Sequence, residues 1–392
     1  MIPDTGKLVA LVGEGSIEVR ECPVPTVAED AILLATGLTG ICGTDVHMIY
    51  HRKLSPERTS RLPIVPGHEI SGRIVRMGPR AQQSVISDQP LKEGDRVVGL
   101  PVVPCGKCWW CRNFGIVQGI YCEGVQPPGR ASEPPYFMGG WGDYIYVGPG
   151  NYLWKVPDDM PYEVAVLTEP FSIAIRGAER ALSLPAWKNE QTLPFGGTAV
   201  VLGAGAIGLL AAAAARIAGA GSIILVGAPQ DALHIAQQAG VADHAIDVLE
   251  TSPEERIARV RSLTAGGYGA DVVFEAAGVG AAFVEGLEMV RRLGTFVELG
   301  NFIDTGETVP VNVPRLITSK DLTIYASYSQ PPHYHGKAIS VLARHWRQIP
   351  FQTFVTGKFR IDQAEEAMRV VRSPSEKGIK ACFTGADYPT RG

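Results

Sequence analysis

The feature of this sequence that most restricts its fold is a glycine-rich turn between an apolar strand and an alanine-rich helix. Residues Thr198–Leu202 have the composition of a buried strand, and Leu209–Ala218 have that of a helix. Gly203 permits a tight turn, Gly205 lets the backbone approach a pyrophosphate, and Gly208 allows the helix to pack closely on the strand. In this context a G-x-G-x-x-G motif predicts a dinucleotide site with the phosphates at the helix N-terminus.

Around this turn the chain alternates strands and helices, which is the pattern of a parallel sheet covered on both faces. Residues 175–327 are therefore predicted to form an α/β, doubly wound Rossmann domain that binds NAD or NADP. Further strands are expected at Ser222–Val226, Asp271–Phe274, Thr295–Leu299 and Leu322–Tyr325. The residues expected to bind the cofactor are Gly203, Gly205, Ala206, Ile207, Gly208, Gly227, Asp231, Ala277 and Gly300.

The choice between NAD and NADP depends on the end of the second strand of this domain. An acidic side chain there would hold the adenosine ribose and repel a 2′-phosphate. The segment Val226-Gly227-Ala228 carries no carboxylate, and the residues after it offer no arginine to a phosphate. Asp231, one helical turn later, could replace the missing acid. The sequence therefore leans towards NAD and leaves NADP open.

Length, composition and charge restrict the class of protein. A chain of 392 residues is too long for one ordinary hydrophobic core and indicates two domains. Apolar residues make up 45% of it and charged residues 19%, which is typical of soluble globular proteins. The net charge of −4 gives no electrostatic reason to expect nucleic acid or a membrane as a partner. The N-terminus lacks the features of a signal peptide, so a cytoplasmic protein is expected.

The first hundred residues consist of short Val/Ile/Leu segments separated by glycine and proline, the pattern of a small β-barrel or sandwich. The polar, aperiodic segment from Gln82 to Pro90 is interpreted as a surface insertion. Strands are expected at Leu8–Val12, Ile17–Val19, Ala31–Ala35, Ile70–Val75 and Arg96–Leu100, with a later one at Tyr144–Val147.

Three side chains of this region are donors that zinc prefers: the Cys42 thiolate, the His68 imidazole and the Glu69 carboxylate. A catalytic zinc takes three protein donors and keeps one position open. Taken singly, Cys42 also fits the interpretation of a small buried residue, and His68 that of a core histidine, without any metal. Their surroundings, described below, favour a metal.

Four of the seven cysteines lie close together, which favours metal binding over a disulfide framework. Their spacing is that of a closed, tetrahedral zinc site, which stabilises a lobe at about residues 100–125 with little core of its own. These structural ligands are Cys105, Cys108, Cys111 and Cys122. We interpret Cys22 and Cys382 as structural residues.

The segment from Gly67 to Gly72, followed by Gly78 and Ala81, resembles the signature of the zinc-dependent medium-chain dehydrogenase/reductase family, which includes alcohol, polyol and threonine dehydrogenases. Cys42 also falls at the spacing of that family. The resemblance implies a GroES-like β-barrel catalytic domain over residues 1–174, the Rossmann domain over 175–327, and a return to the catalytic domain over 328–392.

The resemblance further implies a catalytic zinc held by Cys42, His68 and Glu169. Glu169 precedes Pro170 at the position where polyol and glucose dehydrogenases have their third ligand. Glu69 is the alternative, either as a direct ligand or as a residue behind the metal. With the four-cysteine site, two Zn²⁺ ions per chain are expected.

The activity that the resemblance implies is reversible, NAD(P)-linked oxidation of a secondary alcohol to a ketone. Zinc would lower the pKa of the substrate hydroxyl, and the nicotinamide would accept hydride. Thr44 stands where the family has the hydroxyl that bonds the substrate oxygen, and His47 where it has the residue that relays the proton to solvent.

Several alternatives stay open at this point. The substrate is a polyol or sugar if Glu169 is decisive, or a cyclic or aryl alcohol if Tyr50, Phe137, Trp141 and Phe171 line an apolar pocket. A reductase of C=C or C=N bonds and a non-catalytic nucleotide-binding protein are the rival classes. His333 and His335, in a proline-rich segment, are interpreted as surface residues. A homodimer or homotetramer is expected.

Overall fold

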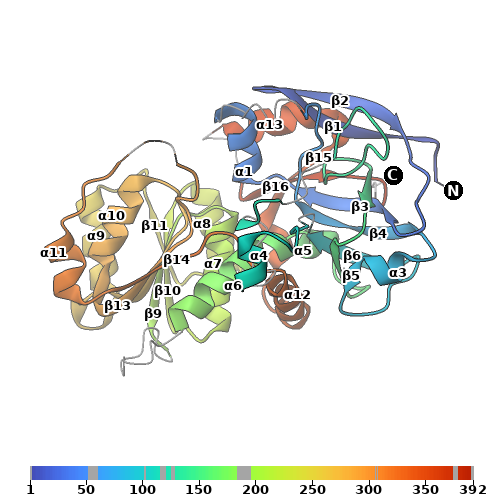
Figure 1. The fold of residues 1–392 in the computed structure, drawn as a ribbon. Helices are drawn as coiled ribbons and strands as arrows, with labels where there is room; N and C mark the ends of the chain where they lie inside the picture. Colours follow the sequence, from blue (N-terminus) through green and yellow to red (C-terminus); the bar gives the residue numbers. More distant parts are fainter. Residues whose placement is uncertain are drawn as a thin grey trace. The chain divides into compact units, whose positions relative to one another are not determined.

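The computed structural model describes residues 2–51, 61–100, 103–114, 121–124, 129–182, 196–304, 306, 308–373 and 378–389. These residues form two compact units (Figure 1). The first, called the catalytic unit below, contains residues 1–169, 331–346 and 351–392. The second, called the nucleotide unit, contains residues 170–330 and 347–350.

The catalytic unit is built on β-strands that are mostly antiparallel. A pair formed by β1 and β2 accompanies an eight-stranded sheet of order β15-β16-β3-β4-β6-β8-β5, in which β7 also pairs with β3. The strands are β1 (Thr5–Gly13), β2 (Ser16–Pro23), β3 (Ile32–Gly40), β4 (Glu69–Met77), β5 (Ile86–Ser87), β6 (Arg96–Leu100), β7 (Tyr144–Val147), β8 (Tyr152–Lys155), β15 (Val355–Arg360) and β16 (Lys380–Thr384).

Helices of this unit are short except for two near its C-terminal part. They are α1 (Gly43–Val46), the π-helix η1 (His47–His51), α3 (Ala81–Ser84), α4 (Trp109–Phe114), α5 (Tyr162–Ala165), α12 (His333–His345), η5 (Phe351–Phe354), η6 (Ile361–Gln363) and α13 (Ala364–Arg372). The helix α6 (Thr168–Leu182) begins at the border between the two units.

β3 is the central strand of the catalytic unit, and all of its residues are buried. It pairs with β4, β7 and β16, which are strands far apart in the sequence. Apolar side chains on its two faces enter different hydrophobic clusters: Leu34 packs with Ile74, whereas Leu33 packs with Phe137. Because β3 ends at Gly40, this buried strand positions the residues that follow it.

The segment from Gln82 to Pro90, interpreted as a surface insertion, is largely exposed and contains regular secondary structure. It contains the end of α3 and all of β5, and Ile86 of β5 pairs with Tyr152 of β8. The segment is too polar to show a clear period, but backbone pairing with an existing sheet edge does not require an apolar side chain at every position.

The nucleotide unit is a parallel six-stranded sheet of order β11-β10-β9-β12-β13-β14. Helices α7 and α8 lie on one face and α9 and α10 on the other (Figure 1). The strands are β9 (Thr198–Leu202), β10 (Ser222–Gly227), β11 (His244–Asp247), β12 (Ala270–Glu275), β13 (Val290–Glu298) and β14 (Thr323–Ala326). The helices are α7 (Ala206–Ile217), α8 (Gln230–Gln238), α9 (Pro253–Ser262), η3 (Ala265–Gly267), α10 (Gly280–Met289), α11 (Val313–Leu316) and η4 (Thr318–Lys320).

This strand order is that of a doubly wound Rossmann sheet, so the predicted α/β fold class is confirmed. Among the predicted strands of this unit, the largest difference is at β13, which begins at Val290 and not at Thr295. Its first residues pair irregularly with β12 around Ala270, and Leu293 has a φ of 61°. This part of the strand therefore lacks the regular alternation from which strands are predicted. None of the described helices has the length and apolar character that crossing a bilayer requires.

Candidate metal centre and cofactor site

Cys42, His68 and Glu69 converge at one place in the catalytic unit. Each offers one ligand atom, and these three atoms all lie within 4.8 Å of one another. Cys42 caps the N-terminus of α1, just after β3, while Glu69 is the first residue of β4. Since β3 and β4 are antiparallel and Gly40 pairs with Glu69, the end of one strand lies beside the start of the other. A thiolate, an imidazole and a carboxylate so close together fit zinc.

The side chain of Asp45 orients this group, although sequence reasoning did not select it. Asp45 is buried, and its carboxylate accepts a hydrogen bond of 2.9 Å from the Cys42 amide and lies 3.6 Å from His68 Nδ1. Burial alone would lower the pKa of His68, but Asp45 and the Cys42 thiol raise it well above its usual value. Because Nδ1 lies beside a carboxylate, Nε2 is the nitrogen that would bind a metal. The signal that could have found Asp45 is its place inside the Cys42–His47 motif.

Thr44 and His47, the predicted proton-transfer residues, lie on either side of Asp45 in the chain. The Thr44 hydroxyl oxygen is 3.5 Å from His68 Nε2, so it lies at the metal-facing side of that imidazole. His47 begins the π-helix η1, and burial together with nearby His51 lowers its pKa. A neutral imidazole near pH 7 can accept a proton, as a relay requires.

Glu69 is completely buried and has one strong partner, which the sequence did not predict. Lys380 of β16 donates to Glu69 Oε1 at 2.5 Å and to the Ile41 carbonyl oxygen at 3.2 Å. Burial lowers the pKa of Lys380, but Glu69 and Cys42 raise it more. Glu69 Oε2 finds no hydrogen-bond partner among the described groups. A Cβ at Gly40 would come within 1.8 Å of that oxygen, so glycine there makes room for the carboxylate.

Glu169 is the second residue of α6, in its first turn. It is not a member of the three-residue group, which contains Glu69 in its place. Of the two predicted third ligands, Glu69 is the one that lies with Cys42 and His68. Glu69 lies with the Cys42 and His68 donors, and one of its carboxylate oxygens, Oε2, has no hydrogen-bond partner among the described groups, which fits a carboxylate that could bind a metal.

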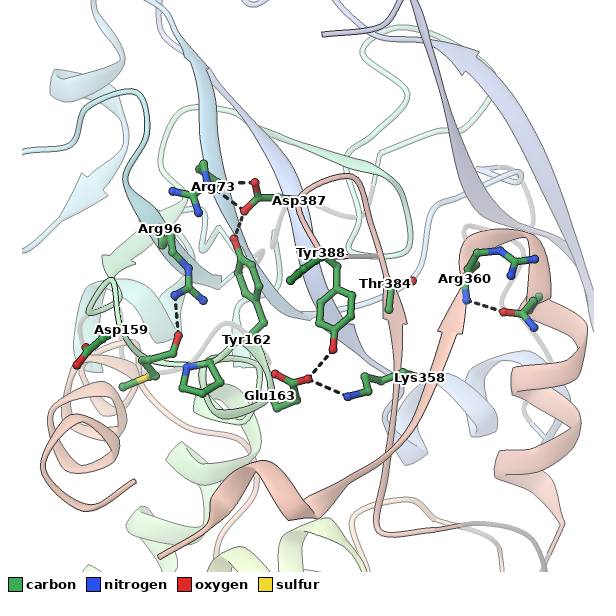
Figure 2. Close-up of a pocket in the computed structure, with 14 residues that line it drawn as sticks. Arg73, Arg96, Asp159, Tyr162, Glu163, Lys358, Arg360, Thr384, Asp387 and Tyr388 are labelled. Carbon is green, nitrogen blue, oxygen red and sulfur yellow. Dashed lines mark hydrogen bonds and ion pairs between the residues drawn. The ribbon is translucent and has the colours of Figure 1, made fainter. Parts of the chain in front are cut away.

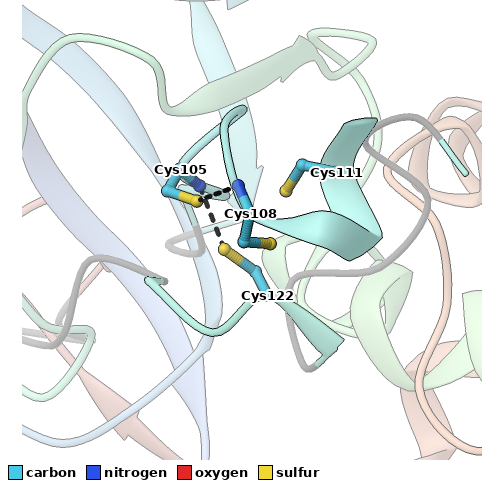
Figure 3. A group of neighbouring side chains, drawn as sticks. All are labelled: Cys105, Cys108, Cys111 and Cys122. Carbon is cyan, nitrogen blue, oxygen red and sulfur yellow. Dashed lines mark hydrogen bonds between the residues drawn. The ribbon is translucent and has the colours of Figure 1, made fainter. Parts of the chain in front are cut away.

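The four predicted structural ligands also come together, with all four sulfur atoms within 4.8 Å of one another (Figure 3). The Cys105 amide donates to Cys122 Sγ at 3.1 Å, and the Cys108 amide donates to Cys105 Sγ at 3.3 Å. Backbone N–H groups at Lys107 and Cys108 lower the pKa of Cys105 to about 6. This arrangement fits a Cys₄ zinc. Part of the long loop between the third and fourth cysteines, residues 115–120, lies outside the described residues.

The predicted cofactor residues gather at the carboxyl edge of the parallel sheet. Gly203 has a φ of 102°, and a Cβ there would come within 2.7 Å of the Ala277 nitrogen. A Cβ at Gly208 would lie 1.8 Å from the Gly203 oxygen, and one at Gly300 would lie 2.4 Å from the Gly278 nitrogen. Gly205 caps α7 and has open space around it. These contacts leave a backbone-lined surface at a helix N-terminus, which suits a pyrophosphate.

Two acidic residues accompany this edge, Glu275 at the end of β12 and Glu298 at the end of β13. Asn301 Nδ2 lies 3.0 Å from Glu275 Oε2 and 3.4 Å from Glu298 Oε1. Burial and the neighbouring Glu298 raise the pKa of Glu275 to about 8. Glu275 Oε1 accepts hydrogen bonds from the amides of Ala277 and Gly278, so this acid shapes the loop that carries Ala277.

The end of β10, where the adenosine ribose is expected to bind, carries no carboxylate of its own. Gly227 is its last residue, and a Cβ there would come within 2.6 Å of the Ala204 nitrogen. Asp231 is exposed in the first turn of α8. A second acid was missed: Asp247, the last residue of β11, pairs directly with Gly227. Its signal was a carboxylate at the end of the third strand of the alternating pattern.

The interpretation of His335 as a surface residue is wrong. His335 lies in the first turn of α12, has no exposed surface, and stacks on Trp154 with ring centroids 5.1 Å apart. Exposed His333, two residues earlier, agrees with the prediction. Of the aromatic residues proposed for an apolar pocket, Phe137 and Trp141 pack within hydrophobic clusters of the catalytic unit.

A hollow of about 1000 Å³ in the catalytic unit is separate from these predicted residues, none of which lines it (Figure 2). Arg73 Nε lies 3.0 Å from Asp387, whose carboxylate also accepts a hydrogen bond from the Tyr162 hydroxyl. Lys358 and Tyr388 both donate to Glu163, at 2.8 and 2.5 Å. These paired groups anchor the C-terminal residues to the sheet and to α5.

Comparison with known proteins identifies the family. A family model described as alcohol dehydrogenase GroES-like domain matches residues 28–158, and one described as zinc-binding dehydrogenase matches residues 206–344. Sorbitol dehydrogenase of Bacillus subtilis is 30% identical over 393 residues, which cover 100% of this chain and 99% of that protein. The 5-exo-hydroxycamphor dehydrogenase of Pseudomonas putida is 30% identical, with 94% of this chain and 96% of that protein covered.

A solved alcohol dehydrogenase from Thermotoga maritima matches with a TM-score of 0.82 and 25% identity, and the match covers 97% of this chain and 99% of that one. The family and fold expected from the motifs are therefore confirmed. The chain belongs to the zinc-dependent medium-chain dehydrogenase/reductase family and is an alcohol dehydrogenase, an oxidoreductase of secondary alcohols that uses zinc and a nicotinamide cofactor.

Proposed function

We propose that this enzyme oxidises a secondary alcohol of the polyol class to a ketone, with the catalytic zinc held by Cys42, His68 and Glu69. The observation that carries the proposal is the convergence of these three donor atoms within 4.8 Å, next to the Thr44 hydroxyl. The polyol class is supported by a carboxylate third donor and by the similarity to a sorbitol dehydrogenase.

Bound at these donors, zinc would supply Lewis acidity that eases deprotonation of the substrate hydroxyl, and the nicotinamide would supply a hydride acceptor. The protein residues then have separate tasks. Asp45 holds His68 in the orientation that directs Nε2 to the metal. Thr44 is placed to accept the substrate proton and His47 to pass it to solvent, because the lowered pKa of His47 keeps its imidazole in the neutral form that can accept a proton.

The ion pair of Glu69 with Lys380 tunes this site. A carboxylate that shares its charge with a buried ammonium is a weaker donor than a free one. The donors would therefore place little net negative charge around a bound metal, because Cys42 contributes one negative charge and Lys380 partly neutralises that of Glu69. Glu169 remains the alternative third ligand.

We further propose two zinc ions per chain, one at this centre and one at the four cysteines, and a preference for NAD. Asp231 and Asp247 both lie at the end of the sheet where the adenosine ribose binds in this fold. Replacing Asp247 by Asn should lower the ratio of kcat/KM for NAD over NADP by about tenfold, because a carboxylate repels a 2′-phosphate. Steady-state kinetics with both cofactors measures it, and an unchanged ratio would contradict the assignment.

The experiment that tests the metal centre compares zinc content and alcohol-dependent cofactor reduction in Glu69→Gln and Glu169→Gln. The proposal expects two zinc ions in the wild type, about one in Glu69→Gln with loss of activity, and two in Glu169→Gln. One zinc in Glu169→Gln and two in Glu69→Gln would assign the third ligand to Glu169. Full activity in a chain without the catalytic zinc would favour the alternative, reduction of C=C or C=N bonds. The homo-oligomeric state and the cytoplasmic location stay predictions.

A further inference from the structure

His335 is a buried polar side chain that the reaction described above does not use. It has no exposed surface, and both of its ring nitrogens lack a hydrogen-bond partner within the described parts of the chain. A buried polar atom without a partner costs roughly 1–3 kcal/mol, so two on one ring are a considerable cost. Such a cost is accepted where a ligand completes the hydrogen bonds.

The surroundings of His335 place it on the same part of the catalytic unit as the metal centre. Its ring stacks on Trp154 of β8, with an interplanar angle of 19°. Trp154 pairs with Val98 of β6, and Val98 pairs with Ser71 of β4, two residues after Glu69. Helix α12 packs on β8, and β8 is separated from β4 by one strand, β6. His335 therefore lies over the part of the sheet that leads to the start of β4.

Electrostatics supports this placement. Burial lowers the pKa of His335, and the charge of His68 lowers it further, to about 3. The two imidazoles therefore influence each other inside one unit. His335 is nevertheless outside the three-donor group, whose atoms lie within 4.8 Å of one another. It belongs to the same unit as the candidate metal centre without being one of its donors.

We propose that His335 recognises a second hydroxyl group of the substrate, next to the carbon that is oxidised. This inference rests on the proposed function and deepens it, because it names a vicinal diol or longer polyol as the preferred substrate. A neutral imidazole has one N–H donor and one acceptor nitrogen, and a hydroxyl group can both accept and donate a hydrogen bond. The His335 ring stacks on Trp154, and this contact fixes the directions in which its two nitrogens point.

Such a hydrogen bond also predicts a large difference in kcat/KM between a diol and the same alcohol without the second hydroxyl. A site built to hydrogen-bond a hydroxyl rejects an analogue without it strongly, because the buried protein group then stays unpaired. Butane-2,3-diol and butan-2-ol have the same carbon skeleton and differ by one hydroxyl. The wild-type enzyme should therefore prefer the diol in kcat/KM.

The test uses three variants with both alcohols. His335→Phe keeps an aromatic ring against Trp154 and removes both nitrogens, so the preference for the diol should fall by about tenfold or more. His335→Gln restores one donor and one acceptor and should recover part of the preference. His333→Phe is the matched control, because His333 is exposed two residues away, and it should keep the wild-type preference.

A binding readout complements the kinetics. In protein labelled with ¹⁵N-histidine, the ring signals missing from His335→Phe belong to His335. Adding butane-2,3-diol should shift them, and adding butan-2-ol should shift them less. The inference is overturned if the wild type shows no preference for the diol, if His335→Phe keeps the preference, or if the diol leaves the His335 signals unchanged.

This design separates the two proposals. If neither alcohol is oxidised, the ring signals still decide whether His335 contacts the diol. The zinc content of Glu69→Gln and Glu169→Gln then decides separately whether the metal centre is correctly assigned.

Discussion

The two candidate metal centres of this protein are built from very different lengths of chain. The four cysteines lie between residues 105 and 122, and two of their contacts are hydrogen bonds from backbone amides within that segment. The other centre joins Cys42, which follows β3, to His68 and Glu69 at the start of β4. Its Glu69 also pairs with Lys380, which lies 311 positions later. A local site depends on spacing, whereas an assembled site depends on the fold around it.

The difference also concerns charge. The cysteine lobe brings together four thiol groups and fits a closed site that serves stability. The assembled centre has buried carboxylates at Asp45 and Glu69, each tied to a specific partner. A site that performs chemistry needs its ligands oriented and their charge adjusted, and both tasks require residues from other strands.

The largest expected effect separates the two centres directly. Replacing Cys42 by Ser should remove one of two zinc ions and lower alcohol-dependent cofactor reduction by about a thousandfold or more, since the metal supplies several kcal/mol of charge stabilisation. Metal analysis and steady-state kinetics measure both quantities. The melting temperature should change little, and retention of both zinc ions would contradict the assignment of Cys42.

The matched change in the lobe is Cys111→Ser. It should also remove one zinc ion, but its main result should be lower stability, because the lobe has little apolar core and metal binding there contributes to folding. Thermal unfolding and limited proteolysis near residues 103–124 measure it. Loss of activity with an unchanged melting temperature would show that this site is not structural.

A third change tests whether the assembled centre depends on distant residues. Lys380→Met leaves the Glu69 carboxylate buried without its cation, which typically costs about 3–5 kcal/mol. Denaturant unfolding of the zinc-free protein measures the free energy of unfolding. The control is Lys358→Met, whose partly exposed pair with Glu163 should contribute about 1 kcal/mol or less. Equal losses in the two variants would contradict the special role of Lys380.

The smallest expected effect concerns the carboxyl pair of the nucleotide unit, a third assembled site. The folded-state pKa of Glu275, about 8, is above its value in the unfolded chain. Stability from this group is therefore complete below about pH 4.5 and is lost as the pH rises through 8, on the order of 1–3 kcal/mol. Glu275→Gln should flatten this slope in unfolding measured from pH 5 to 9. An unchanged slope would contradict it.

Sequence reasoning found groups that the structure brings together where they depend on neighbours along the chain. The Gly203–Gly208 turn, the four cysteines and the Cys42–His47 motif each have short spacings with a direct physical meaning. It failed at His335, whose proline-rich context suggested a surface loop. The structure instead starts α12 there and buries the ring against Trp154, because β8 supplies an apolar surface that the local sequence does not announce.

The same limit explains the missed residues Asp247 and Lys380. Each is an ordinary charged residue at a strand end, and only strand pairing gives it a role: Asp247 beside Gly227, and Lys380 beside Glu69. The uncertainty between Glu69 and Glu169 has this cause too, since both carboxylates have suitable positions in the sequence.

The sequence by itself determined the two-unit α/β organisation, the dinucleotide turn, the four-cysteine lobe and the family, because periodicity, glycine geometry and ligand spacing act over short distances. Only the tertiary structure showed which carboxylate lies beside Cys42 and His68, which cation pairs with it, and that His335 is buried. Those outcomes depend on which strands pair and which helix covers them, and burial changes the energy of a polar group by several kcal/mol only after that packing exists.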